Sequence, residues 1–307
     1  MKAKVTYLMV AAIGLSLGWM IGIGGPYWNG LPVTFVCAAL AFAINWIVFI
    51  PAWLSRSDRF FDLMGAATYV SVVACALALT GPPGVPGLVL AAMVGVWALR
   101  LGTMLFTRIN KAGEDVRFRE IKHDFVRFLG TWTLQGLWVV MTSAGAVVVL
   151  TNQDRLSFDV FFIIGAVMWV IGFAIEVLAD QQKGRFRADP ENQGRFITTG
   201  LWSWSQHPNY FGEILLWTGI AVIAFPHLAG WGWLALISPV FVWILLTRVS
   251  GIPMLDNVAE KRWGGGRGVY RLHKSDIETC PCATQECAPR IQQLASRALS
   301  EESGLSD

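Results

Sequence analysis

Eight long apolar stretches divide this chain and limit its fold more than any other feature. Each is close to the roughly 20 residues that an α-helix needs to cross a hydrocarbon core of about 30 Å. The composition agrees, because 54% of the residues are hydrophobic and only 15% are charged. We therefore predict an all-α polytopic membrane helix bundle with about eight (seven or eight) transmembrane helices. The expected helices span residues 5–25, 33–54, 60–80, 86–107, 131–151, 160–180, 211–226 and 230–247.

The positive charges predict the orientation of this bundle. Of the 24 Lys and Arg residues, 22 lie before the first stretch or in alternate connections, at 55–59, 108–127, 181–210 and from 248 onward. The connections between them hold only Arg155. The positive-inside rule places the basic side in the cytosol. Both termini are therefore expected to be cytosolic, and the first stretch is expected to be a helix rather than a cleaved signal peptide.

Neither nucleic acid nor a metal ion is predicted as a partner. The net charge of +3 is too small to indicate nucleic acid. Cys37 and Cys75 lie within apolar stretches, where a small buried side chain is the simplest interpretation. The alternative of a zinc site rests on four residues of the C-terminal tail, which lack the paired CxxC spacing of structural zinc sites. They are His273, Cys280, Cys282 and Cys287.

Ionisable residues within the apolar stretches are the first candidates for a functional site, because a charge there is costly. All of them fall in the half of the bundle that is predicted to face the cytosol. We therefore predict a cytosol-facing cavity, with snorkelling or mutual pairing as the alternative. Glu176 and Asp180 share one helix face, and Glu213 is expected in the first turn of the seventh helix. The five residues are Asp62, Arg100, Glu176, Asp180 and Glu213.

The connection at 181–210 mixes arginines with Gly, Pro, Asn and aromatic residues. Arginines can donate paired hydrogen bonds to phosphate, and the start of the following helix offers unpaired N–H groups to an anion. Asn209 and Glu213 are four residues apart and share the face nearest that end. These features predict a site for a phosphate-bearing cofactor. The alternative is a basic loop that is attracted to anionic lipid.

Several stretches resemble the C-terminal region of the steroid 5-alpha-reductase-like superfamily, and most of all its bacterial branch. The strongest of them reads Ser-Gln-His-Pro-Asn-Tyr-Phe-Gly-Glu at 205–213. The resemblance covers roughly residues 55–264, and the superfamily also contains isoprenylcysteine-type methyltransferases. It implies an integral protein of a bacterial inner membrane. The other similar stretches lie at 97–102, 114–118, 186–196, 200–213 and 248–256.

This resemblance implies NADPH as the cofactor. The spacing of the superfamily's binding residues is matched without gaps from Asp180 to Glu213. The arginines would bind the phosphates, with Asn209 and Glu213 nearer the carboxamide. The His-Pro-Asn-Tyr turn adds a histidine and a tyrosine to this set. The predicted cofactor-binding residues are Asp180, Arg187, Arg195, His207, Asn209, Tyr210, Glu213 and Arg248.

The resemblance also implies reduction of the C=C bond of a conjugated enone in a lipid or steroid-like substrate. In that reaction a hydride goes to the beta carbon while an acid polarises the carbonyl oxygen. Asp62 stands where the family has a glutamate, and Trp97 stands where it has a tyrosine. Asp62 is therefore the predicted catalytic acid, with Tyr69 as the second catalytic candidate. The substrate is expected to be a lipophilic small molecule that enters from the bilayer, with membrane lipid around the protein and the active site facing the cytosol.

We predict a single transmembrane helical domain at 1–264 and a disordered polar tail at 265–307. One alternative function is an S-adenosylmethionine-dependent methyltransferase of the isoprenylcysteine type. The other is a non-enzymatic membrane scaffold or quinone-interacting subunit. The arginines favour the reductase, because NADPH carries three phosphates and S-adenosylmethionine carries none. The cofactor site is expected to form from residues 55–62, 97–127, 176–213 and 248–264.

Overall fold

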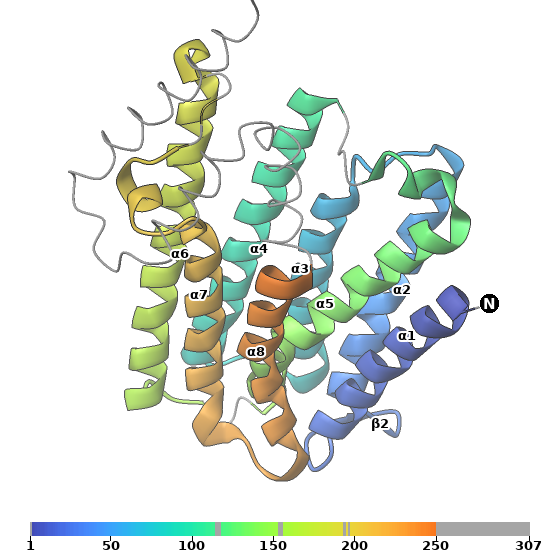
Figure 1. Cartoon of the computed structure of the whole chain (residues 1–307). Helices are drawn as coiled ribbons and strands as arrows, with labels where there is room; N and C mark the ends of the chain where they lie inside the picture. The colour runs from blue at the N-terminus through green and yellow to red at the C-terminus, as the bar shows by residue number, and fades with distance from the viewer. Residues whose placement is uncertain (1, 114–117, 153–155, 193–194, 196, 250–307) are drawn as a thin grey trace, which may run out of the picture. The chain divides into compact units, whose positions relative to one another are not determined.

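The computed structural model is built from helices that follow the apolar stretches (Figure 1). It describes residues 2–113, 118–152, 156–192, 195 and 197–249, so the predicted tail at 265–307 lies outside the described residues. Within them, seven helices are long and apolar enough to cross a membrane, which confirms the predicted all-α bundle. The main helices are α1 Lys2–Ile21, α2 Val33–Leu54, α3 Phe61–Thr80, α4 Val85–Ala112, α5 Phe125–Thr151, α6 Val160–Ala188, α7 Pro208–Ala224 and α8 Ile237–Ile244.

Helix α6 is longer than predicted, and this corrects the assignment of 181–210 as a loop. The helix continues to Ala188, because Gln, Lys and Arg are good helix formers and 181–188 contains no proline. Its 29 residues span about 43 Å, which exceeds the roughly 30 Å of a hydrocarbon core. Arg187 therefore lies in the last turn of a helix rather than in a loop.

Helices α5 and α7 begin earlier than predicted. Helix α5 starts at Phe125 rather than 131, because the Asp124 side chain accepts hydrogen bonds from the backbone N–H groups of Val126 and Arg127 at 2.9 and 3.0 Å. Helix α7 starts at Pro208, a residue that suits the first turn of a helix. Glu213 therefore lies in the second turn of α7, and its predicted place in the first turn is wrong.

Short elements connect the main helices. The strands β1 Tyr27–Trp28 and β2 Leu31–Pro32 form an antiparallel hairpin in a connection that was expected to be a loop. Its turn residues Asn29 and Gly30 both have positive φ, the conformation that a tight two-residue hairpin requires. The short helical turns are η2 Ile121–His123, η4 Pro190–Asn192, η5 Gly200–Ser203, η6 Phe225–His227, η7 Gly230–Leu236 and the π-helical turn η8 Leu245–Val249.

Backbone contacts group the chain into two compact units, which are described separately below. The first unit comprises Met1–Trp169 and Trp217–Phe241, and the second comprises Val170–Leu216 and Val242–Asp307. Helices α6, α7 and α8 each contribute to both units. The single domain expected over 1–264 stays a prediction.

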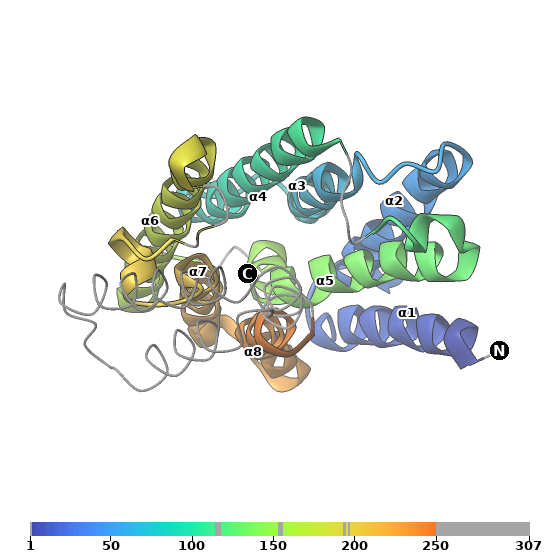
Figure 2. The same cartoon turned by 45° about the horizontal axis from the view of Figure 1, so that its top comes forward.

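Helix α5 is the centre of the first unit. It contacts α1, α2, α3 and α4, and its side chains are buried along almost the whole helix. Figure 2 shows α5 alongside α1, with α2 and α3 on its other side. Because α5 contacts all four of the preceding helices, its side chains are well placed to line a cavity within the unit.

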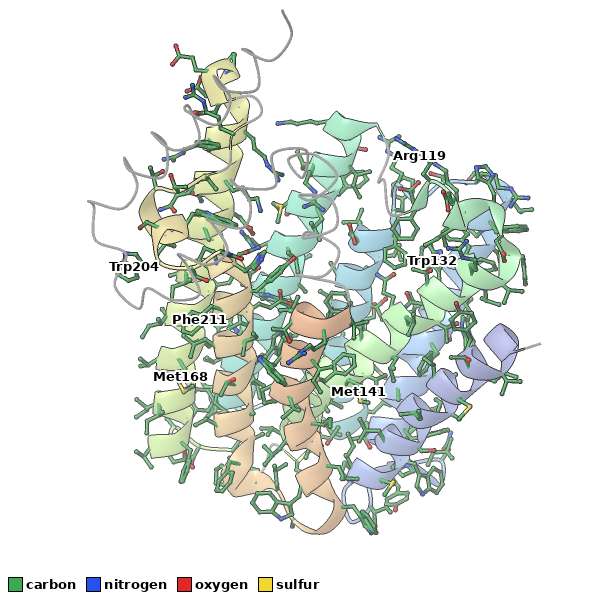
Figure 3. The ribbon with its side chains drawn as sticks, viewed as in Figure 1. Arg119, Trp132, Met141, Met168, Trp204 and Phe211 are labelled. Carbon is green, nitrogen blue, oxygen red and sulfur yellow. The ribbon has the colours of Figure 1, made fainter. Side chains whose placement is uncertain are left out.

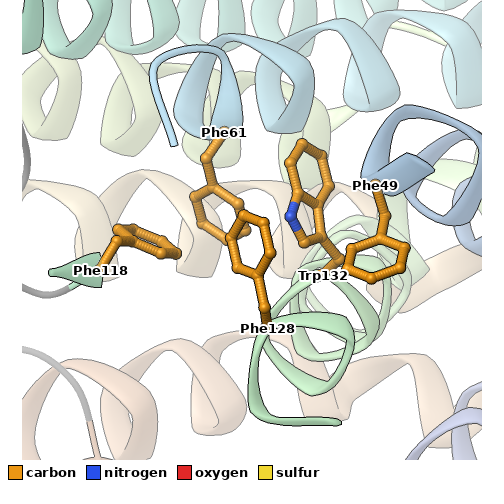
Figure 4. Packing of buried hydrophobic residues seen from close by; sticks show 5 residues of the cluster. All are labelled: Phe49, Phe61, Phe118, Phe128 and Trp132. Atoms are coloured by element: carbon orange, nitrogen blue, oxygen red, sulfur yellow. The ribbon is translucent and has the colours of Figure 1, made fainter. Parts of the chain in front are cut away.

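An aromatic cluster fixes the start of α3 in this unit (Figure 4). Phe61 packs against Phe118 and Trp132, with ring centroids 4.8 and 5.1 Å apart. The preceding turn is held by the ion pair between Asp58 and Lys122, whose charged atoms are 3.5 Å apart. The first turn of α3, which carries Asp62, is therefore anchored on both sides. The cluster comprises Phe49, Phe61, Phe118, Phe128 and Trp132.

Glycines bring the backbones of α6 and α7 into contact within the second unit. A Cβ on Gly172 would lie 2.6 Å from Gly212 O, and a Cβ on Gly212 would lie 2.5 Å from Gly172 O and 2.7 Å from Glu176 N. Small residues permit this close approach between membrane helices. The packing places buried Glu176 against the α7 turn that carries Glu213.

Candidate active site

The segment after α6 is docked onto the end of that helix in the second unit. The backbone N–H of Leu201 donates to Gln182 Oε1 at 2.9 Å, and Trp202 Nε1 donates to Ala179 O at 2.9 Å. Lys183 Nζ lies 4.3 Å from the centre of the Trp202 ring. These contacts fix η5, so the chain enters α7 from a defined position.

Two predicted arginines lie on the polar end of this unit. Arg187 is exposed in the last turn of α6, and half-buried Asp180 lies seven residues earlier on the same face. Arg195 is also exposed, and its backbone N–H donates to Asn192 O at 3.1 Å. Asn192 Nδ2 in turn donates to Phe186 O at 3.2 Å, which folds the chain back against α6.

The start of α7 combines stacked rings with a buried acceptor. The rings of His207 and Tyr210 stack with centroids 5.2 Å apart and planes at 13°. The backbone N–H groups of Tyr210 and Phe211 both donate to His207 O, at 3.1 and 3.2 Å. Asn209 Oδ1 is buried and has no hydrogen-bond partner among the described residues. Because a buried acceptor without a partner is costly, a ligand at this position would be stabilising.

All eight residues of the predicted cofactor set fall within the second unit. Glu213 is buried one turn beyond Asn209, with 6% of its surface exposed. Arg248 is exposed in η8. Trp204, in the segment between α6 and α7, is 81% exposed and offers an open ring face (Figure 3). The unit thus supplies positive charge, a helix start and aromatic rings.

The two predicted catalytic residues lie in the first unit, where both line one cavity of about 70 Å³. Asp62 is half-buried in the first turn of α3. Tyr69 is buried two turns later on the same helix face. Of the five ionisable residues singled out in the sequence, Asp62 is the one that lines this cavity. Glu176, Asp180 and Glu213 belong to the second unit.

Two of the rings that line this cavity, those of Tyr69 and Trp97, pack against a third aromatic ring. The Tyr69 and Trp97 rings meet edge to face with centroids 5.1 Å apart, and Trp97 meets Trp217 in the same way at 4.9 Å. Tyr69 and Trp217 are 5.9 Å apart. Trp217, on α7, was not a predicted site residue, because a tryptophan in an apolar helix gives no signal of its partners.

Gln135 and Trp138 on α5 also line the cavity and were missed in the sequence. Gln135 Nε2 donates to Phe61 O at 2.8 Å, which ties α5 to the start of α3. The sequence did contain a signal, because Gln135 is the only amide side chain in the apolar stretch at 131–151. A buried amide in a membrane helix is costly unless it is hydrogen-bonded. An uncharged polar residue in an apolar stretch is therefore a candidate site residue, as a charged one is.

The fold is that of a polytopic helical membrane protein. Its second unit carries exposed arginines, and its first unit holds a small cavity with a mostly apolar lining. A protein-family model matches residues 48–276. The chain therefore belongs to the DUF1295 family, described as a protein of unknown function, within the steroid 5-alpha-reductase-like superfamily. This membership confirms the resemblance found in the sequence.

Three curated relatives are similar to parts of the chain. An uncharacterized protein of Schizosaccharomyces pombe is 25% identical over 49% of this chain and 54% of its own length. A probable O-methyltransferase of Ustilaginoidea virens is 26% identical over 42% and 43% of the two chains. The bovine 3-oxo-5-alpha-steroid 4-dehydrogenase 1 is 32% identical over 26% and 30%. The chain spans about half or less of the length of these relatives, and no solved structure matches it.

Proposed function

We propose that this protein is a membrane reductase that uses NADPH to reduce the C=C bond of a conjugated enone in a lipophilic substrate. The similarity to a bovine protein named as a steroid dehydrogenase supports an oxidoreductase, and the superfamily supports an enzyme. The observation that carries the proposal is the start of α7, where the buried Asn209 Oδ1 has no hydrogen-bond partner in the part of the chain that the structure describes and lies in the same unit as the exposed arginines. A dinucleotide with phosphates and a carboxamide needs both features.

The residues of the second unit fit NADPH by their chemistry. Arg187 and Arg195 would bind its phosphates, and the N–H groups at the start of α7 would add to this attraction. Asn209 Oδ1 would accept a hydrogen bond from the carboxamide, beside the stacked rings of His207 and Tyr210. Asp180, Glu213 and Arg248 complete the proposed set. When bound, NADPH supplies the hydride of the reaction.

The cavity of the first unit would hold the reacting end of the substrate. Asp62 would donate a proton to the carbonyl oxygen as negative charge develops there, with Tyr69 as the second donor. The surrounding Phe61, Trp97 and Leu101 would exclude water from that step. A lipophilic substrate would reach these helices from the bilayer.

The distribution of charge supports a cytosolic site. The basic residues at 181–210 and from 248 onward fall on the side that the positive-inside rule assigns to the cytosol. We place both termini and the cofactor residues there, in the inner membrane of a bacterium. NADPH is available on that side of the membrane.

A methyltransferase is the second candidate, because one relative is named as a probable O-methyltransferase. Thermal unfolding of the detergent-solubilised protein separates the candidates. A ligand at a hundred times its Kd adds about 2.7 kcal/mol to stability, so we expect NADPH to raise Tm by several degrees and S-adenosylmethionine to leave it unchanged. A shift with S-adenosylmethionine alone would favour the methyltransferase. No shift with NADPH, NADH or S-adenosylmethionine would favour the non-enzymatic scaffold.

A further inference from the structure

Two cysteines of the first unit lie 38 positions apart in the chain but meet in the fold. Cys37 is buried in the second turn of α2, and Cys75 is half-buried near the end of α3, both as free thiols. Helices α2 and α3 pack against each other, and because a short connection joins them, they run in opposite directions. The second turn of α2 therefore lies beside the last turns of α3.

A second contact between the two helices shows which of their turns face each other. Asn45 Nδ2 donates to Thr68 Oγ1 at 3.4 Å. Cys37 lies eight residues before Asn45, and Cys75 lies seven residues after Thr68. At about 1.5 Å per residue, these steps cover about 12 Å along α2 and about 10.5 Å along α3, in the same direction. Cys37 and Cys75 are therefore at the same level of the helix pair.

The Cys37 thiol is directed at the turn of α3 that contains Cys75. Its S–H donates to Val72 O at 3.7 Å. In an α-helix that carbonyl oxygen also accepts from the backbone N–H four residues later, which belongs to Ala76, the neighbour of Cys75. The Cys37 and Cys75 thiols themselves lie within hydrogen-bonding distance of each other. Level and direction thus agree in placing the two sulfur atoms together.

We propose that Cys37 and Cys75 form a redox pair, which closes to a disulfide when a small-molecule disulfide reaches it. Helices with axes about 8–10 Å apart and Cα atoms about 2.3 Å from each axis bring facing Cα atoms within about 6 Å, and a disulfide spans about 4.4–6.8 Å. The pairing rests on the contacts between α2 and α3 alone. The proposed orientation places this end of both helices outside the cytosol, where disulfides persist.

The reaction consists of two successive thiol–disulfide exchanges. The thiolate of Cys75, the more exposed cysteine, attacks one sulfur of the oxidant, and the other half of the oxidant leaves as a thiolate. The Cys37 thiolate then attacks Cys75 Sγ, which forms the internal disulfide, breaks the mixed disulfide and releases the second half of the oxidant. The protons of the two cysteines end on the two released thiols. The cysteine pair is oxidised by two electrons, and the oxidant is reduced by two.

The intact mass of the full chain after oxidation tests this pair. The parent protein would carry Cys280→Ser, Cys282→Ser and Cys287→Ser, so that Cys37 and Cys75 are its remaining cysteines. The oxidant is dithiodipyridine, a lipid-soluble small disulfide. We expect the mass to fall by two hydrogens, with no pyridylthio group added, and a reductant to restore it. A pyridylthio group on each cysteine, or two unreacted thiols, would overturn the proposal.

Two variants of this parent separate the pair from ordinary thiol chemistry. Cys37→Ala should stop at the mixed disulfide, with one pyridylthio group on Cys75, because no second thiol is present to displace it. Ala74→Cys combined with Cys75→Ala keeps the depth of the thiol but turns it by about 100° around α3. Ala74 is exposed, so this variant should take up a pyridylthio group at position 74 and form no internal disulfide. Closure as complete as in the parent would overturn the assigned pairing.

Thermal unfolding shows whether the bond forms in the native fold. A disulfide between α2 and α3 restricts the unfolded chain, so oxidation should raise the Tm of the parent by several degrees. Cys37→Ala, treated in the same way, should show no such rise. A lower Tm in the oxidised parent would mean that closure distorts the fold, and this result would overturn the proposal. Because none of these measurements uses NADPH, their failure would leave the proposed reductase standing, and a failed reductase would leave the cysteine pair standing.

Discussion

Single residues carry the two halves of the proposed chemistry in different ways. The proposed cofactor residues would act through exposed charge, as with Arg187 and Arg195, and through the buried Asn209 Oδ1, which has no hydrogen-bond partner among the described residues. The proposed substrate residues would act from a confined cavity, where Asp62 is the only charged residue among the described residues of the lining. Substitutions at the two sites should therefore have different signatures, one in cofactor affinity and the other in turnover.

Arg187→Ala and Arg195→Ala should each weaken NADPH binding by about 1.5–3 kcal/mol, the range for hydrogen bonds to charged groups. The arginine that contacts the 2′-phosphate should lose more affinity for NADPH than for NADH. Arg185→Ala is the matched control, because Arg185 is also exposed near the end of α6 but points away from the face of Arg187. Calorimetry with both nucleotides measures these losses. Unchanged affinity in both variants would remove these arginines from the site.

Asp62→Asn should lower turnover of an enone lipid at least tenfold while NADPH affinity is retained. Asparagine keeps the size of the side chain and some ability to donate, but it has no acidic proton, and losing a donor to a developing oxyanion costs about 10²–10³ in rate. Asp124→Asn is the control, because Asp124 caps α5 outside the cavity and asparagine caps a helix equally well. If Asp62→Asn keeps full activity, Tyr69 and Tyr210 become the next candidates for the proton donor.

At the scale of elements, the contact between α6 and α7 positions the start of α7. Gly172 and Gly212 let the two backbones touch, so any side chain at either position must push the helices apart. The start of α7 carries Asn209 and Glu213. Helix packing and the proposed cofactor site are therefore coupled in the second unit.

Gly172→Ala should destabilise the protein by about 1–3 kcal/mol, because the added methyl group would meet backbone atoms that cannot rotate away. It should also weaken NADPH binding by moving Asn209. Gly184→Ala is the control on the same helix, since a Cβ there meets nothing within 4 Å. That control should stabilise the protein by up to about 1 kcal/mol. Thermal unfolding and calorimetry measure both effects, and equal behaviour of the two variants would contradict the proposed coupling.

For the whole molecule, charge determines the expected orientation in the membrane. Positive residues gather in alternate connections, and those connections also contain six of the eight proposed cofactor residues. The helices themselves have no such preference, because their apolar surfaces suit either direction. Orientation is thus a property of the complete chain rather than of any one helix.

Reporter fusions at positions 30, 83, 155 and 228 should all score as external, because these connections hold one of the 24 basic residues. Fusions at positions 57 and 122 should score as cytosolic, since they lie in basic connections. Paired alkaline phosphatase and fluorescent protein reporters give opposite signals on the two sides. Two external positions that score as cytosolic would refute this topology.

Much of the fold follows from the sequence because the bilayer imposes a local rule. Any segment that crosses it must satisfy its own backbone and present apolar side chains, so the bounds of α2 and α3 were predicted to within one residue. The predicted end of α6 is wrong, because the helix continues beyond the hydrocarbon core, where apolar side chains no longer mark it. The motif at 205–213 indicated the superfamily because its residues are consecutive in the chain, so it does not depend on tertiary contacts.

Tertiary structure alone decided which side chains meet. Gln135 and Trp138 line the cavity that holds Asp62 and Tyr69, and Trp217 packs against Tyr69. All three are more than 60 positions away from Asp62 and Tyr69 in the chain. Their convergence depends on how each helix is rotated about its axis and how closely neighbours approach. Those quantities depend on contacts such as Gly65 against Gln135, between residues that are 70 positions apart. The sequence determined how many helices form and where, while packing across distant segments determined what lies in the cavity.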